Sequence, residues 1–569
     1  MRRETGVRKR QGDMLDGLAA WLAATGRVAP HFATLPPPRA DGDPLRGAQL
    51  MAAARSPLDA PRTPFAETAA LTFRWLDDLA ALGSRAARER AWLWLEGWDR
   101  RTGWHADLSA GRLRRWIGHA EFLTGPGRSS PRALLAGATR EMHFLRRRWK
   151  SLPEGPARVE ALTALVTGSL ALARMRSFTG PFARGLATEA ARSVDPGGAV
   201  ASRNPEELLD LLTLLVEARD ALSAAGLPVP PAVTDAIQRA APTLRLLRQA
   251  DGGLPRLHGG GTPPPGKLDR ALLVSGARAN SIAGAPAVAT MGYLRLAASR
   301  TTLIVDAAPP PMGTASRLAH ASTLAFELTS GRRPLIVSCG PGSALGADWE
   351  NAARATPSHS VLGIEGLSSA RLGTRRDTEE LLSDGPRNVR AEVTTGDEGP
   401  LLVLSHDGYV ASHGLTHVRE LELSRDGRML RGYDALGAAT EPDRRVLERA
   451  ILNSRLQGVH FTIRFHLHPA VKAKVEAEQI VLHLPSKEVW IFRQAGAARM
   501  SLDASVWLDP HLSAPRPSRQ IVLSGLVADK AGEVGWTLAK SEDTPLAIRD
   551  TEPAEEELPQ AARAIRADA

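Results

Sequence analysis

The spacing of apolar residues changes once along the chain, near Leu254, and this change constrains the fold more than any other feature. Before it, from about Pro64 to Arg248, apolar residues recur every three or four positions, as in ARVEALTALVTGSLALARM, which is typical of amphipathic helices. After it, they alternate or form β-branched runs such as TTLIVDA, which indicates strands. The sequence therefore predicts a helical half followed by a β-sheet half.

The helical half contains several consecutive helix pairs. Proline or acidic residues stand at the start of its apolar segments, and glycine or proline follows them, as expected at helix starts and ends. Two segments, PEELLDLLTLLVEARDAL and PAVTDAIQRAAPTLRLLRQA, are joined only by the short loop AAGLPVP. Hairpins of this kind, repeated along a chain, favour a helix bundle, a solenoid or an α/α toroid.

The sheet half follows two clusters of glycine and proline, GGGTPPPG and APPPMG. The pair Asp426-Gly427 separates two alternating runs, which predicts a β-hairpin, and similar runs continue to Trp536. We therefore expect a large antiparallel sandwich. The predicted divisions are a partly helical N-terminal extension (1–60), a toroid-like helical domain (61–270), the sandwich (285–540) and a disordered charged tail (541–569).

The chain is basic, with a net charge of +10, and so suits a polyanionic sugar, a nucleic acid or an anionic lipid. The compositional bias of a GC-rich genome explains the same excess of arginine equally well. Cys339 is the single cysteine, which excludes an intramolecular disulfide. No apolar run reaches the roughly 20 residues of a membrane span. The N-terminus reads as an amphipathic helix rather than an export signal, which points to a cytoplasmic location.

Several short segments on both sides of the junction point to one family. In the sheet half they are RLAHASTLAFEL (317–328), LIVSCG (335–340) and RATPSHSVLGIEG (354–366), and in the helical half SRNP (202–205) and DGGLPRLHGG (251–260). Together they resemble the heparinase II/III-like family of polysaccharide lyases, over roughly Pro64 to Leu538. The resemblance implies an α+β multidomain fold: an (α/α) toroid-like helical domain followed by a large antiparallel β-sandwich.

The resemblance also implies β-elimination on a uronic-acid-containing acidic polysaccharide. This reaction removes the proton beside a carboxylate, so it needs a group that neutralises the carboxylate, a base, and an acid for the leaving oxygen. The chain departs from the family pattern at four positions, where Ala199 and Leu318 replace histidines and Ser322 and Ser338 replace acidic residues. No tyrosine precedes Tyr293, so the helical domain has none to offer as acid or base.

A rearranged site is therefore expected at the junction. Its catalytic residues would be His258, on a glycine-rich loop between the halves, His320 and Tyr293. Arg203 and Asn204 would bind the substrate carboxylate, because the planar guanidinium fork matches a carboxylate and an amide can donate one hydrogen bond. Asn204, which proline follows, also fits a helix cap, and both interpretations stay open.

The sheet half offers further polar side chains. His417 and Arg419 alternate on one predicted strand and so share a face; with Tyr409 they are predicted to line a sugar groove, the alternative being an ordinary solvated strand. His320 and His359 match two of the three ligand-type positions in zinc-containing relatives. A zinc ion bound by these two histidines is one expectation, and hydrogen bonding within the sandwich is the other.

Three functions remain open at this point. The first is a lyase acting on an acidic polysaccharide, and the second is a non-catalytic relative that binds acidic glycan in the same cleft. The third is a nucleic-acid or membrane-surface protein that uses the net positive charge. No Walker loop, dinucleotide fingerprint, HExxH, CxxC or GxSxG motif is present, and no nucleic acid is expected as partner. The family resemblance implies the cell envelope or periplasm, whereas the N-terminus carries no clear signal.

Overall fold

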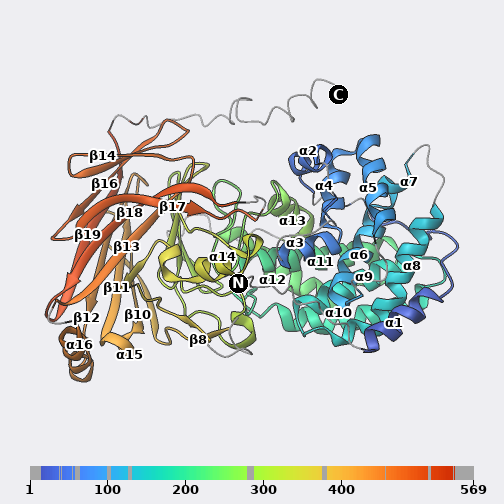
Figure 1. Ribbon diagram of the computed structural model, residues 1–569, viewed down its shortest axis with the longest axis horizontal. Helices are drawn as coiled ribbons and strands as arrows, with labels where there is room; N and C mark the ends of the chain where they lie inside the picture. Colours follow the sequence, from blue (N-terminus) through green and yellow to red (C-terminus); the bar gives the residue numbers. More distant parts are fainter. Residues whose placement is uncertain are drawn as a thin grey trace, which may run out of the picture.

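The computed structural model divides into a helical half and a β-sheet half that lie side by side along its longest axis (Figure 1). The structure describes residues 14–37, 39, 42–53, 56–57, 64–98, 104–125, 131–277, 287–364, 366–373, 381–454, 457–510, 514–542 and 544. The basic segment 1–13 and nearly all of the predicted disordered tail lie outside the described residues. In the described part of the chain, no helix is long and apolar enough to cross a membrane.

The helical half is built around α9, whose side chains are almost all buried because neighbouring helices cover it on several sides. Helices α6, α8, α10 and α11 pack against it. The helices of this half are α1 (Met14–Ala24), α2 (Pro44–Ala52), α3 (Pro64–Leu71), α4 (Arg74–Leu82), α5 (Arg85–Gly97), α6 (Ala106–Gly118), α7 (Ala120–Thr124), α8 (Pro131–Arg148), α9 (Pro156–Ala171), α10 (Thr179–Ser193), α11 (Pro205–Ala224), α12 (Pro231–Leu247) and α13 (Lys267–Ser275).

The sheet half consists of two large antiparallel sheets. The first has the order β1-β2-β3-β4-β5-β13-β18-β17, with β6 also paired to β13, and the second has the order β14-β15-β16-β19-β12-β11-β10-β9. The strands of the first are β1 (Ala287–Thr290), β2 (Tyr293–Ala298), β3 (Thr301–Asp306), β4 (Phe326–Ser330), β5 (Arg333–Val337), β6 (Leu362–Ile364), β13 (Val459–Leu467), β17 (Arg499–Trp507) and β18 (Arg516–Val527). Those of the second are β9 (Val389–Thr395), β10 (Pro400–Tyr409), β11 (Leu415–Leu423), β12 (Met429–Gly437), β14 (Lys472–Glu476), β15 (Gln479–His483), β16 (Val489–Ala495) and β19 (Ala531–Lys540).

The two sheets enclose one apolar core, to which both contribute large aromatic side chains. Phe326 and Phe465 come from the first sheet, Phe492 and Trp536 from the second, and the Phe465 and Trp536 rings lie 4.8 Å apart between centroids. Alternate residues of each strand point into this core, which is the two-residue period seen in the sequence. The helical half followed by an antiparallel sandwich confirms the predicted fold class.

Shorter elements complete the sheet half. The predicted hairpin is confirmed: β11 pairs antiparallel with β12, and Gly427 in the turn has a φ of 68°, which a side chain would disfavour. The pair β7 (Arg371–Leu372) and β8 (Leu382–Asp384) forms a small third sheet. Three helices, α14 (Ala347–Arg354), α15 (Val410–His413) and α16 (Glu441–Asn453), lie in connections.

Candidate functional site

Six polar side chains, five of them singled out in the sequence, meet where β3 and the connections around β4 face the loops of the helical half. We call them the junction cluster. Each lies inside the protein, and their rings and charged groups touch in succession. The members are Arg203, His258, Tyr293, Asp306, His320 and His359, of which only Asp306 was not singled out in the sequence.

The centre of the junction cluster is an ion pair between the two halves of the molecule. Arg203, in the loop before α11, donates from Nη2 to Asp306 Oδ1 at 2.5 Å, and Asp306 ends β3. The same guanidinium donates to the carbonyl groups of Met291, Gly292, Ala308 and Pro309. Every donor nitrogen of Arg203 is therefore used within the protein, and its planar fork binds backbone and Asp306 instead of a ligand.

Asp306 also fixes the orientation of His258. Its Oδ2 lies 3.2 Å from His258 Nε2 and accepts a hydrogen bond of 2.7 Å from Ser322 Oγ. His258 Nδ1 accepts a hydrogen bond from the backbone N–H of His320, so the ring proton belongs on Nε2, facing the carboxylate. Burial would raise the pKa of Asp306, but Arg203 and His258 together hold it below its ordinary value. Burial lowers the pKa of His258 more than Asp306 raises it, so this imidazole is neutral.

Tyr293 begins β2 and packs its ring against the Arg203 guanidinium, 4.9 Å from the ring centroid. Its hydroxyl donates to the carbonyl oxygen of Arg203 at 2.7 Å. Burial raises the pKa of Tyr293 well above its ordinary value. A phenol that is enclosed, occupied as a donor and hard to deprotonate has neither the access nor the acidity that proton transfer to a sugar needs.

Asn204 caps helix α11. Its Oδ1 accepts hydrogen bonds from the backbone N–H groups of Glu206 at 2.9 Å and Glu207 at 3.3 Å, and Pro205 occupies the first helical position. The cap interpretation is thus confirmed. The side chain is buried, so the structure does not present it as a carboxylate ligand.

His320 and His359 lie together, with ring centroids 5.0 Å apart. His320 Nδ1 and both ring nitrogens of His359 are buried without a hydrogen-bond partner of good geometry among the described residues. Free imidazole nitrogens suit zinc, but a closed site needs about four ligands. No group of three or more histidine, cysteine or carboxylate side chains in the described ranges could hold a metal ion, so the residues present do not fit a zinc centre.

The proposed groove on the sheet face is corrected by the structure. Tyr409, His417 and Arg419 are buried inside the sandwich. Arg419 and His417 both bind Asp434, at 2.7 Å from Arg419 Nε and 2.8 Å from His417 Nε2, and Tyr409 donates to the carbonyl group of Leu362. His417 and Arg419 do share a face of β11, as predicted. That face points into the core, where Asp434 on β12 supplies the compensating charge.

The position that the family resemblance assigns to a catalytic histidine is Leu318, and it is 37% exposed. A Cβ added to Gly259 would lie 2.7 Å from Leu318 Cβ, so the leucine sits directly on the glycine loop that carries His258. An apolar side chain therefore lies at the surface where the family chemistry needs a base, while the histidines are enclosed beneath it.

The hollow surface at this junction lies beside the cluster. Two adjoining hollows, of about 560 and 480 Å³, share the lining residues Arg248, Gln249, Ala250 and Arg332. We call them together the arginine groove. Its cationic side chains come from both halves of the chain; they are Arg248, Arg256, Arg295, Arg300 and Arg332. No member of the junction cluster is among its lining residues.

The arginine groove contains acidic and aromatic groups as well. Glu327 binds the loop of the helical half, accepting from Gln249 Nε2 at 2.8 Å and from the backbone N–H of Arg256. Arg248 is paired with Asp269 at 2.7 Å, and the Arg256 guanidinium lies over the Trp507 ring, 3.4 Å from its centroid. Arg332 is exposed and has no hydrogen bond or ion pair within the described part of the chain. Sequence reasoning missed this groove because its arginines are scattered over more than 80 residues.

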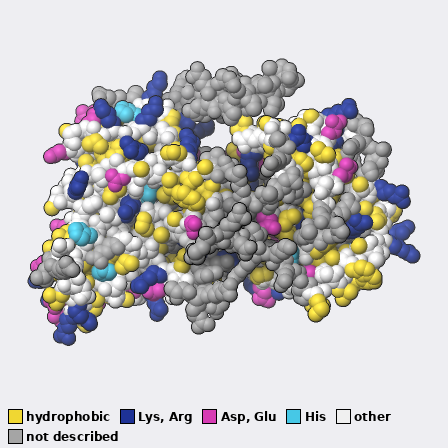
Figure 2. All heavy atoms as spheres, viewed as in Figure 1, with side chains coloured by type: hydrophobic (Ala, Val, Ile, Leu, Met, Phe, Trp, Pro, Cys, Tyr) yellow, Lys and Arg dark blue, Asp and Glu magenta, His cyan; other side chains and the backbone are white. Residues whose placement is uncertain are grey.

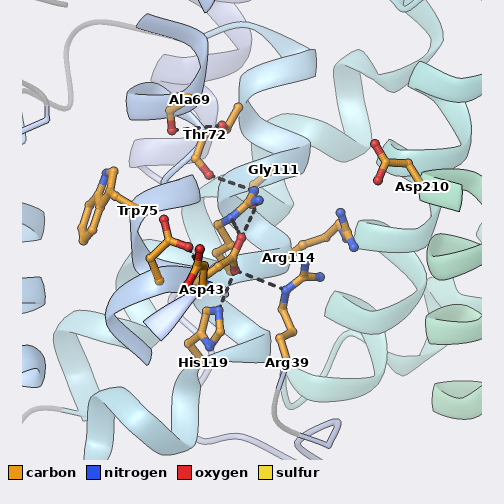
Figure 3. Close-up of polar contacts among 12 residues, drawn as sticks. Arg39, Asp43, Ala69, Thr72, Trp75, Gly111, Arg114, His119 and Asp210 are labelled. Atoms are coloured by element: carbon orange, nitrogen blue, oxygen red, sulfur yellow. Dashed lines mark hydrogen bonds and ion pairs between the residues drawn. The ribbon is translucent and has the colours of Figure 1, made fainter. Parts of the chain in front are cut away.

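A second buried polar cluster, also missed from the sequence, lies in the helical half (Figure 3). Asp77 on α4 accepts hydrogen bonds from Arg115 at 2.8 Å and from His119 at 2.7 Å, and Arg39 lies 3.5 Å away. Burial would raise the pKa of Asp77, but Arg115 and Arg39 hold it well below its ordinary value. The carboxylate is fully paired, so the cluster holds helices together. Its one sequence signal was the Asp77-Asp78 pair within an apolar helix.

Two comparisons identify relatives of the sequence. Residues 283–537 match the model of a family described as Heparinase II/III-like, C-terminal. The chain is also 29% identical over 494 residues to FtsZ-localized protein C of Caulobacter vibrioides, a match that covers 83% of this chain and 81% of that protein. This second match therefore extends across both halves.

Solved structures share the fold. A crystal structure of heparinase III superimposes with a TM-score of 0.62 at 13% identity, covering 84% of this chain and 78% of that one. The heparan sulfate lyase HepC from Pedobacter heparinus gives a TM-score of 0.52 at 12% identity, covering 97% of this chain and 86% of that one. At such low identity these likenesses establish the architecture alone.

Proposed function

We propose, from the premise that its C-terminal domain belongs to the heparinase II/III-like family, that this protein binds an acidic polysaccharide without cleaving it. The observation that carries the proposal is the burial of His258, Tyr293 and His320, the residues best suited to the family's proton transfers. Each is enclosed and held by a neighbour within the chain. The chain thus has the fold of a polysaccharide lyase, but the side chains expected to perform the reaction instead make contacts between the two halves of the molecule.

The chemistry of β-elimination explains why burial matters. A base must come within hydrogen-bond distance of the proton beside the uronate carboxylate, and an acid must reach the glycosidic oxygen. Neither His258 nor His320 offers a ring nitrogen to the surface, and Leu318 occupies the exposed position. Arg203, the expected carboxylate binder, is saturated by Asp306 and four carbonyl groups.

The arginine groove is the proposed binding site. Guanidinium groups bind carboxylate and sulfate groups through paired hydrogen bonds. Arg256 is buried and donates to the carbonyl groups of Ser338 and Leu508, so it contributes mainly positive charge to the groove. Exposed Arg332 is available to a ligand. A polyanionic chain lying along both hollows would thus meet arginines from both halves.

The second candidate function is a catalytic lyase with a rearranged site. The family resemblance and the histidines at the junction support it. It requires the junction cluster to open and expose His258 or His320. The two functions differ in one measurement, which is the formation of an unsaturated uronate product.

We expect no product and measurable binding. Ultraviolet absorbance of the unsaturated uronate should stay at the level of a blank with heparan sulfate, alginate, hyaluronan and glucuronan, with and without added zinc. Titration calorimetry should detect binding to at least one of them, weakening as salt is raised because the contacts are ionic. Product formation on any of the four would overturn the non-catalytic proposal and favour the lyase.

A charge reversal locates the binding site. Arg332→Glu should weaken binding about tenfold, the equivalent of about 1.4 kcal/mol, because one attractive charge becomes repulsive. Arg387→Glu, at an exposed position outside the groove, makes the same change in net charge and should have little effect. Equal effects of the two substitutions would mean that binding follows net charge instead of the groove.

The relative from Caulobacter vibrioides suggests where the protein acts. Its name states localization with FtsZ, and its similarity covers both halves of this chain. We extend the proposal to the same location, so that a glycan-binding protein lies at the FtsZ structure. A fluorescent fusion expressed at native level should form a band that coincides with labelled FtsZ and disperses when FtsZ is depleted. An even distribution in cells with intact FtsZ bands would contradict this extension.

A further inference from the structure

Helix α1 presents large apolar side chains to solvent. Met14 is 90% exposed, Leu15 and Leu18 are each 54% exposed, and Trp21 is 62% exposed. Positions 14, 18 and 21 follow one another at helical spacing and so lie on one side of the helix. Figure 2 shows hydrophobic side chains gathered at the lower right edge of the molecule, where Figure 1 places α1. We call these four residues the α1 stripe.

The opposite side of α1 attaches the helix to the protein through small and charged groups. Ala19 and Ala23 pack on Phe144 of α8, in a small apolar cluster separate from the main core. Asp16 is buried and accepts a hydrogen bond of 2.6 Å from Arg148 at the end of α8. A helix of a globular protein normally turns its large apolar residues inward. In α1 the order is reversed, because alanines and an ion pair face the protein and the stripe faces out.

Basic residues lie near the α1 stripe, some along the sequence and some in the described structure. The ten residues that open the chain, MRRETGVRKR, contain five arginine or lysine residues and a single glutamate. Beyond the C-terminal end of α1, Arg27 is exposed and Val28 is 43% exposed. On α8, against which α1 packs, Arg147 is also exposed. An apolar stripe with tryptophan, flanked by cations, matches the surface of an anionic bilayer, where apolar groups enter the acyl boundary and cations meet the headgroups.

We propose that α1 lies in the plane of an anionic lipid bilayer and attaches the protein to it through the α1 stripe. A second copy of the chain is the less suitable occupant, because the net charge of +10 and the cations beside the stripe make two copies repel each other. The proposal stands on α1 and its flanks and is independent of the glycan function. It assigns the protein to a membrane surface.

Vesicle sedimentation of the full-length protein tests the proposal directly. The protein should sediment with vesicles containing phosphatidylglycerol and phosphatidylcholine, and much less with phosphatidylcholine alone. The double variant L18E/W21E should lower partitioning at least tenfold, because it removes apolar contact and adds repulsive charge. The matched control L273E/L452E changes two leucines that are 80% and 63% exposed on other helices and should partition like the natural chain.

Two outcomes would overturn the proposal. One is unchanged partitioning of L18E/W21E when its thermal unfolding midpoint matches that of the natural chain. The other is a natural chain that dimerises in sedimentation equilibrium and becomes monomeric with the same substitutions, without binding vesicles. Both substituted positions are more than half exposed, so the variant is expected to fold, and a melting curve checks this. Glycan binding is measured separately, so its failure would leave the vesicle result unaffected.

Discussion

Replacement of Asp306 by alanine is expected to destabilise the protein by about 3–5 kcal/mol, the usual result when one partner of a buried ion pair is removed. Asp306 is fully buried, and its loss would leave the Arg203 guanidinium without its counter-charge. His258 would lose the carboxylate that faces Nε2. Chemical denaturation at neutral pH, followed by circular dichroism, measures the change in unfolding free energy.

Ser322→Ala is the matched control for Asp306→Ala. It removes one hydrogen-bond donor to the same carboxylate and leaves both charges in place, so we expect a smaller loss, of about 1.5–3 kcal/mol. Combining Asp306→Asn with Arg203→Met should be less harmful than the sum of the two single changes, because the double variant has no unpaired charge. A loss below about 1 kcal/mol for Asp306→Ala would show that the ion pair does not hold the two halves together.

The same prediction bears on function. Arg203 belongs to the helical half and Asp306 to the sandwich, so their pairing closes the junction where a lyase would keep its reacting groups accessible. If this ion pair closes the junction, Asp306→Ala should raise proteolysis at the loop that carries His258. It should still give no uronate product, because Leu318 remains where the base is needed.

The architecture could be predicted from the sequence because it depends on local periodicity. Helix α11 begins at Pro205 after the Asn204 cap, and the Asp426-Gly427 turn joins β11 to β12, as the residue pattern indicates. Such signals need only neighbours along the chain. The ion cluster around Asp77 joins residues from 39 to 119, and no local pattern specifies that pairing.

That the predicted site residues come together at the junction could also be predicted from the sequence, but that they are buried there could not. His258 and Tyr293 stand close to the change of period, so they must lie near the domain contact, whereas the family resemblance placed Arg203 there. Whether such residues face a cleft or each other depends on a partner across the junction. That partner is Asp306, which ends a fully buried strand and has no motif of its own. The prediction that Arg419 lines a sugar groove was wrong for the same reason. Alternation of residues along a strand shows which side chains share a face, but it does not show which face is covered.

The second large effect expected is acid unfolding at an unusually high pH. Burial, as the main cause, lowers the pKa of His359 and of His468 to about 3 and that of His466 to about 4, and it lowers those of His320 and His406 well below their ordinary value. In the unfolded chain these groups return to about 6.5. Below that pH the unfolded state binds more protons, so stability falls as pH falls. At pH 5 each of the three histidines with a pKa of about 3 or 4 contributes a loss of about 2 kcal/mol by this linkage.

These three groups together would remove about 6 kcal/mol by pH 5, and His320 and His406 would add to the loss, which is comparable to the whole stability of an ordinary domain. We therefore expect cooperative unfolding between about pH 6 and pH 5, above the range in which carboxylates such as Asp306 begin to protonate. Unfolding free energy measured in urea at half-unit steps of pH from 7.5 to 5 gives the slope. Each buried histidine should contribute up to about 1.4 kcal/mol per pH unit to it.

One substitution distinguishes proton uptake by buried histidines from other causes of acid unfolding. His359→Leu removes a buried imidazole whose nitrogens have no hydrogen-bond partner of good geometry, so it should reduce the slope between pH 6 and pH 5 by about 1.4 kcal/mol per pH unit. His460→Gln replaces an exposed imidazole on the same half and serves as the control, because it removes no buried imidazole. If the natural chain holds a constant unfolding free energy down to pH 5, the buried histidines must already carry protons when folded. His359 would then need a stronger counter-charge than Asp306, which raises its pKa by less than burial lowers it.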